Sequence, residues 1–60
     1  MKVYLLWRDC ENGRTLVGIY QTRVLANQEC ERKARQWAEL NPLRTRELNP
    51  FWIEEYKVQQ

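Results

Sequence analysis

The 60-residue chain contains no histidine and no serine, and it has only two cysteines and two glycines. Without these residues it lacks the side chains that enzymes use most often as a general base and as a hydroxyl nucleophile. Cys10 and Cys30 alone cannot supply the four protein ligands of a structural zinc site. The sequence also has no Gly-rich phosphate-binding loop. We therefore expect a protein that is not an enzyme and that has no metal and no cofactor.

Long hydrophobic runs are absent as well. The apolar run near the N-terminus covers residues 3–7, whereas the core of a signal peptide needs about 7–15 residues and a membrane-spanning helix needs about 20. Residues 1–60 are expected to form a single small domain in the cytoplasm, away from any membrane. In that reducing compartment both cysteines are expected to remain free thiols.

The excess of positive charge is small. Ten basic and eight acidic residues give a net charge of +2, which does not by itself indicate binding to nucleic acid. Charged residues make up 30% of the chain and hydrophobic residues 43%, which is typical of a folded soluble domain rather than a disordered one.

Three segments are typical of β-strands. Residues 2–9, 15–21 and 51–58 are rich in Val, Ile, Leu, Tyr and Trp, which favour a pleated surface. The sequence Glu11-Asn12-Gly13-Arg14 between the first two strands predicts a tight hairpin, with a type I′ turn that needs positive φ at both central residues. Gly18 inside the second strand indicates a bulge or close packing.

A helix is predicted from Arg23 to Leu40, with Thr22 as its N-cap. The pairs Glu29–Lys33 and Glu31–Arg35 have the favourable i,i+4 spacing on its surface. Asn41-Pro42 is expected to end the helix, because proline disfavours helical geometry in the residue before it. Residues at helical spacing form one stripe that faces the sheet: Ala26, Cys30, Ala34, Trp37 and Leu40.

Together these elements predict an α+β fold of the order β-β-α-β, a three-stranded antiparallel sheet with one helix packed on one face. Side chains alternate between the two faces of a strand. The side facing the helix is expected to carry Val3, Leu5, Trp7, Val17, Ile19, Phe51 and Ile53. The uncovered side is expected to carry Tyr4, Leu6, Leu16, Tyr20 and Trp52. Tyr56 joins this uncovered side if the third strand is regular, whereas a bulge near Glu54-Glu55 moves Tyr56 and Val58 to the helix side.

An uncovered apolar face predicts association rather than catalysis, because monomers rarely expose a large contiguous apolar patch. Our leading hypothesis is a protein-interaction module whose partner is another protein or a second copy of the chain, with no small-molecule substrate. The residues expected to contact that partner are Tyr4, Leu6, Leu16, Tyr20 and Trp52.

Nucleic-acid binding is the alternative hypothesis. Aromatic side chains on an open sheet can stack on bases while basic residues hold phosphates. Tyr4, Tyr20 and Trp52 would stack, and the basic contacts would come from Lys2, Arg8, Arg14, Arg44 and Arg46. The acidic third strand, which carries Glu54 and Glu55, argues against this hypothesis.

Three short patterns resemble a family of small orphan domains of unknown function found in bacteria and their phages. The matching segments are Val3-Tyr4-Leu5-Leu6-Trp7, Val17-Gly18-Ile19-Tyr20-Gln21-Thr22 with Ala26, and Phe51-Trp52-Ile53-Glu54-Glu55-Tyr56-Lys57-Val58. The chain departs from the family pattern in placing Gly18 before Ile19, and in its two Asn-Pro steps after the helix. The resemblance implies a β-β-α-β unit and no activity, and a phage or mobile-element origin would suit an adaptor or inhibitor of host machinery.

Overall fold

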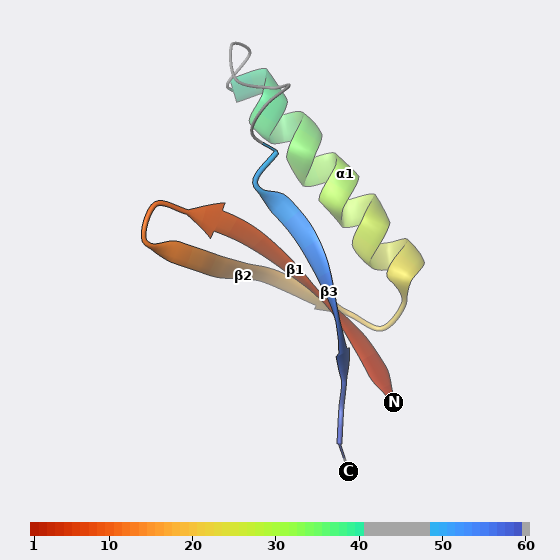
Figure 1. Cartoon of the computed structure of the whole chain (residues 1–60). Helices are drawn as coiled ribbons and strands as arrows, with labels where there is room; N and C mark the ends of the chain where they lie inside the picture. Colours follow the sequence, from red (N-terminus) through yellow and green to blue (C-terminus); the bar gives the residue numbers. More distant parts are fainter. Residues whose placement is uncertain (41–48, 60) are drawn as a thin grey trace.

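A computed structural model describes residues 1–40 and 49–59 of the chain. Strands β1 (Lys2–Cys10), β2 (Gly13–Tyr20) and β3 (Phe51–Lys57) form one antiparallel sheet in the order β2-β1-β3. Helix α1 (Arg23–Leu40) joins the two edge strands and packs on one face of the sheet (Figure 1). This arrangement confirms the predicted α+β fold and the β-β-α-β order.

The hairpin between β1 and β2 forms where it is predicted, but its turn is of another kind. Cys10 pairs with Gly13, so Glu11 and Asn12 alone make the loop. Gly13 has a φ of 135°, and no non-glycine residue in the described part of the chain has positive φ. The predicted type I′ turn is therefore wrong. The glycine is still needed, because its backbone lies in a region that side chains disfavour.

Helix α1 begins at its predicted cap. The hydroxyl of Thr22 accepts a hydrogen bond from the Leu25 amide at 3.2 Å, and the Thr22 carbonyl accepts one from the Ala26 amide. Ala26 is fully buried, and Cys30, Ala34 and Trp37 are half-buried, so this part of the predicted stripe does face the sheet. Leu40 is 81% exposed, contrary to the prediction that it faces the sheet. The Asn41-Pro42 stop signal lies outside the described residues.

The predicted i,i+4 ion pairs on α1 are not the ones that form. The carboxylate of Glu29 pairs with Arg32 instead, at 2.7 Å and a spacing of three residues. Arg32 donates to this carboxylate from both Nε and Nη2, and a two-pronged contact of this kind outcompetes a single lysine ammonium. Lys33 is thereby left without a carboxylate partner among the described residues.

A bulge in β2 decides which side chains face the helix. Leu6 lies opposite Gly18, but the next residue, Trp7, lies opposite Leu16, so Val17 is an extra residue in its strand. The predicted irregularity near Gly18 is therefore present. Strand β3 pairs with β1 in one unbroken register from Phe51 to Lys57, so no bulge occurs near Glu54.

Our assignment of β1 to the two faces of the sheet is wrong. Leu6 is fully buried beneath the helix, and the guanidinium of Arg23 in α1 lies 5.2 Å from the centre of the Tyr4 ring. Tyr4 and Leu6 therefore face the helix, and Leu5 and Trp7 face away from it. The small residue opposite Leu6, Gly18, explains this choice, because a side chain there would meet the Tyr20 ring under the helix.

The core is small. Leu6 and Ala26 are the only fully buried hydrophobic residues in the described part of the chain. The molecule measures 44 × 25 × 14 Å, so along its shortest axis it is little deeper than one sheet and one helix require. Of the described elements, none lies over the face of the sheet opposite α1 (Figure 1).

Candidate functional site: the open face of the sheet

We define the open face as the side of the sheet opposite α1. All three strands contribute to it, and its central strand is β1. Its side chains, assigned from the strand pairing and the bulge, are Val3, Leu5, Trp7, Asp9, Arg14, Leu16, Ile19, Trp52, Glu54 and Tyr56.

Two tryptophans and an arginine form a stack on the open face. The rings of Trp7 and Trp52, which lie opposite each other on β1 and β3, have centroids 6.0 Å apart and planes 24° apart. The guanidinium of Arg14 lies 4.1 Å from the Trp7 ring centre and 5.5 Å from that of Trp52. Cation–π contacts of this kind hold an arginine flat over a ring. The stack thus fixes three large side chains on the face before any partner arrives.

Both indole N–H groups of the stack are already satisfied within the chain. Trp7 donates to Glu54 at 3.2 Å, and Trp52 donates to Asp9 at 2.9 Å. These bonds tie β1 to β3 from the open side. They also mean that covering the face would leave neither indole donor unpaired.

Apolar side chains surround the stack and reach solvent. The exposed fraction is 43% for Leu16, 60% for Ile19 and 55% for Tyr56. Ile19 lies opposite Leu5, and Tyr56 lies opposite Val3, so these groups continue the apolar surface away from the tryptophans. Contiguous exposed apolar surface of this kind marks interaction sites in soluble proteins.

The structure brings together only part of the predicted contact set. Leu16 and Trp52 lie on the open face as predicted. Tyr4, Leu6 and Tyr20 do not, because the face assignment of β1 and of the end of β2 is reversed. In their place the open face holds Leu5, Trp7 and Ile19. The sequence signal that identifies them is Gly18, whose lack of a side chain suits the crowded side beneath the helix. Because side chains alternate along a strand, Ile19 next to Gly18, and Leu5 and Trp7 next to its partner Leu6, then point to the open face.

The predicted basic contacts are also dispersed. Arg14 is on the open face, Arg8 is on the helix side, and Lys2 pairs with Glu55 at 3.3 Å. Arg44 and Arg46 lie outside the described residues. Among the described residues, the open face thus carries one arginine against the two carboxylates of Asp9 and Glu54.

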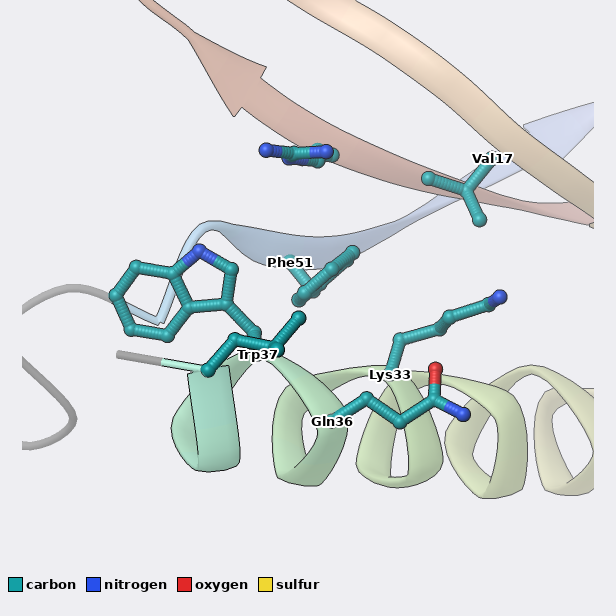
Figure 2. A pocket seen from close by; sticks show the side chains of 7 residues that line it. Val17, Lys33, Gln36, Trp37 and Phe51 are labelled. Atoms are coloured by element: carbon teal, nitrogen blue, oxygen red, sulfur yellow. The ribbon is translucent and has the colours of Figure 1, made fainter. Parts of the chain in front are cut away.

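A groove lies between α1 and the sheet. It encloses about 410 Å³, and Figure 2 shows Lys33, Gln36 and Trp37 of the helix facing Val17 and Phe51 of the sheet. Arg8 and Leu40 complete its lining. Its charged side chains, Arg8 and Lys33, are both cationic, so the groove suits a small anion better than a cation.

Two groups on the helix side, Cys30 and Tyr20, have a raised pKa. Burial, followed by the charge of Glu31, raises the pKa of the Cys30 thiol. Burial, followed by the charge of Glu29, raises the pKa of Tyr20, whose ring lies over Gly18. Both changes favour the neutral form, so neither group is prepared to act as a nucleophile near neutral pH.

Within residues 1–40 and 49–59, no group of three or more His, Cys, Asp or Glu side chains could hold a metal ion. No helix in the described part of the chain is long and apolar enough to cross a membrane. Comparisons with protein-family models, with curated proteins and with solved structures found no match.

Proposed function

We propose that this chain is a non-catalytic protein-interaction module that docks its open face onto another protein or onto a second copy of itself. The observation that supports this most is the exposure of Leu16, Ile19 and Tyr56 around a stacked tryptophan pair, on a sheet face that no described element covers. Tyr and Trp are enriched at protein interfaces, where their large rings bury much surface at little cost in conformational entropy.

An adaptor or inhibitor role in the cytoplasm is the form of this function that we propose. The resemblance to small bacterial and phage domains favours a short chain that acts by occupying a partner's surface. Its two unbridged thiols, Cys10 and Cys30, are consistent with a reducing compartment.

Nucleic-acid binding remains the rival, and one observation favours it. Trp7, Trp52 and Arg14 form an aromatic and cationic platform of the kind on which bases stack. The carboxylates of Asp9 and Glu54 hold the two indoles, however, and would repel a phosphate backbone beside them. We therefore favour a protein partner.

Site-specific photocrosslinking in the native host tests the proposal. A benzophenone amino acid is placed at Leu16 on the open face or, as a control, at Val24, which is 64% exposed on α1. We expect protein adducts of discrete mass from position 16 and none of comparable yield from position 24. Equal adducts from both positions would contradict the proposal, and adducts removed by nuclease treatment would favour the rival.

A further inference from the structure

We propose that the groove between α1 and the sheet binds a small organic carboxylate with an aromatic body. The groove lies on the opposite side of the sheet from the open face, so this inference is independent of the proposed function. Three observations carry it: two cationic side chains of the groove have no partner, its other walls are aromatic and aliphatic, and it joins the helix to all three strands.

The groove carries positive charge that the described part of the chain does not neutralise. Arg8 on β1 and Lys33 on α1 line it, and no carboxylate does among the described residues. Neither the Arg8 guanidinium nor the Lys33 ammonium has a hydrogen-bond or ion-pair partner there. Glu29, one helical turn before Lys33, is held by Arg32 instead. Since Lys33 is half-buried, an anion in the groove would meet both cations where water screens them less than at the open surface.

The donors of the groove favour a carboxylate over a phosphate. The planar guanidinium of Arg8 can donate to both oxygens of a carboxylate, and the amide of Gln36, three residues along α1 from Lys33, adds a further N–H donor. Phosphate sites commonly use the backbone N–H groups at the start of a helix. This groove instead lies along the second half of α1, from Lys33 to Leu40, so it offers no such donors to a doubly charged group.

The remaining walls of the groove suit an aromatic body. Figure 2 shows the indole of Trp37 toward one end, the ammonium of Lys33 toward Val17 at the other, and the ring of Phe51 between them. The volume of about 410 Å³ lies within the range of about 300–1,000 Å³ of small-molecule sites, which combine apolar walls with a few polar groups. An aromatic ring can pack against Trp37 and Phe51 while its carboxylate reaches the cations. An inorganic anion would leave those walls uncovered.

A ligand in the groove would contact both layers of the fold. Arg8, Val17 and Phe51 come from β1, β2 and β3, and the other lining residues come from α1. Only Leu6 and Ala26 are fully buried in the described part of the chain, so the helix and the sheet share a small core. A ligand that binds only the folded chain stabilises it by mass action. We therefore expect the Tm to rise with ligand concentration.

An NMR titration of the isotope-labelled full chain with phenylpropionate, up to millimolar concentration, tests this inference. Of the three tryptophans, Trp37 lines the groove, whereas Trp7 and Trp52 lie on the open face and serve as internal controls. We expect a saturable shift of the Trp37 indole N–H signal, no comparable shift of the other two, and NOEs between the ligand ring and the Val17 methyls. Phenylpropionamide has the same shape without the charge and should bind about tenfold or more weakly, because it forms no charge-assisted hydrogen bonds with the two cations.

Variants of the two cations give a second test, with circular dichroism to verify that each one folds. Arg8→Gln and Lys33→Gln should each weaken binding of phenylpropionate about tenfold or more. The control is Arg35→Gln, which removes an exposed cation of α1 that does not line the groove and should leave the affinity nearly unchanged.

Three results would overturn the inference. The first is a Trp37 signal that does not shift, and the second is an Arg35→Gln variant that binds as weakly as Lys33→Gln. The third is equal binding of phenylpropionate and its amide by the native chain, a comparison that needs no variant. Tighter binding of phenyl phosphate or acetate than of phenylpropionate would likewise contradict an aromatic carboxylate as the ligand.

Discussion

At the scale of single residues, Leu6 contributes most to the packing between the helix and the sheet. It is fully buried, it lies on the central strand, and its strand partners are Gly18 and Ile53. With so few buried side chains among the described residues, the loss of one large aliphatic group cannot be absorbed by the rest. Stability should therefore depend on Leu6 far more than on the apolar residues of the open face.

Leu6→Ala should lower the free energy of unfolding by about 2–5 kcal/mol, because it removes buried methyl groups and leaves a cavity. That is a large part of the stability expected for 60 residues, at about 0.05–0.15 kcal/mol per residue. The measurement is urea unfolding followed by circular dichroism at low micromolar concentration. The control is Ile19→Ala, which should cost less than about 1 kcal/mol. Equal losses for the two variants would show that Leu6 is not the core residue.

The two cysteines should differ in reactivity. Cys10 is exposed at the end of β1, whereas Cys30 is half-buried on α1 with a raised thiol pKa. At pH 8 a disulfide reagent such as DTNB should therefore modify Cys10 faster than Cys30, since only the thiolate attacks. Cys10→Ser and Cys30→Ser variants assign the two phases. Faster reaction at Cys30 would mean that the inner face of α1 is open to solvent.

At the scale of elements, the bounds of the helix and the strands follow closely from the sequence. Thr22 and the Asn12-Gly13 sequence are strong local signals for a helix start and a hairpin, and α1 has the predicted bounds Arg23–Leu40. The choice of face in β1 could not be predicted from alternation, because Tyr4 and Leu6 on one side are as apolar as Leu5 and Trp7 on the other. Tertiary packing decides it: the bulge at Val17 interrupts the alternation in β2, and Gly18 gives the helix side its room.

The N-cap of α1 provides a test at this scale. Thr22→Ala removes the acceptor for the Leu25 amide and should lower the free energy of unfolding by about 1 kcal/mol. Thr22→Ser retains a hydroxyl and should restore most of that stability. Thermal and urea unfolding measure both variants against Gln21→Ala, a change at the exposed neighbouring position. A serine variant as unstable as the alanine variant would argue against the cap.

At the scale of the whole molecule, the described helix covers one face of a three-stranded sheet, and no other described element lies over the opposite face. Prediction from sequence reached this asymmetry, and it placed two of its five proposed contact residues, Leu16 and Trp52, on the open face. It missed the stack of Trp7, Trp52 and Arg14, because that cluster depends on the register between three strands rather than on any local pattern. The function we propose depends on this asymmetry between the two faces. The residues of the stack determine only the chemical character of the open face.

Solvent accessibility of individual methyl groups in dilute solution tests that asymmetry most directly. A soluble gadolinium chelate is added to methyl-labelled native chain at low micromolar concentration, and the paramagnetic relaxation of each methyl is measured by NMR. We predict strong relaxation for Leu16 and Ile19, and weak relaxation for Leu6 and Ala26, which are fully buried. Protection of Leu16 and Ile19 equal to that of Leu6 in the dilute chain would show that the open face is already covered, and would contradict the account.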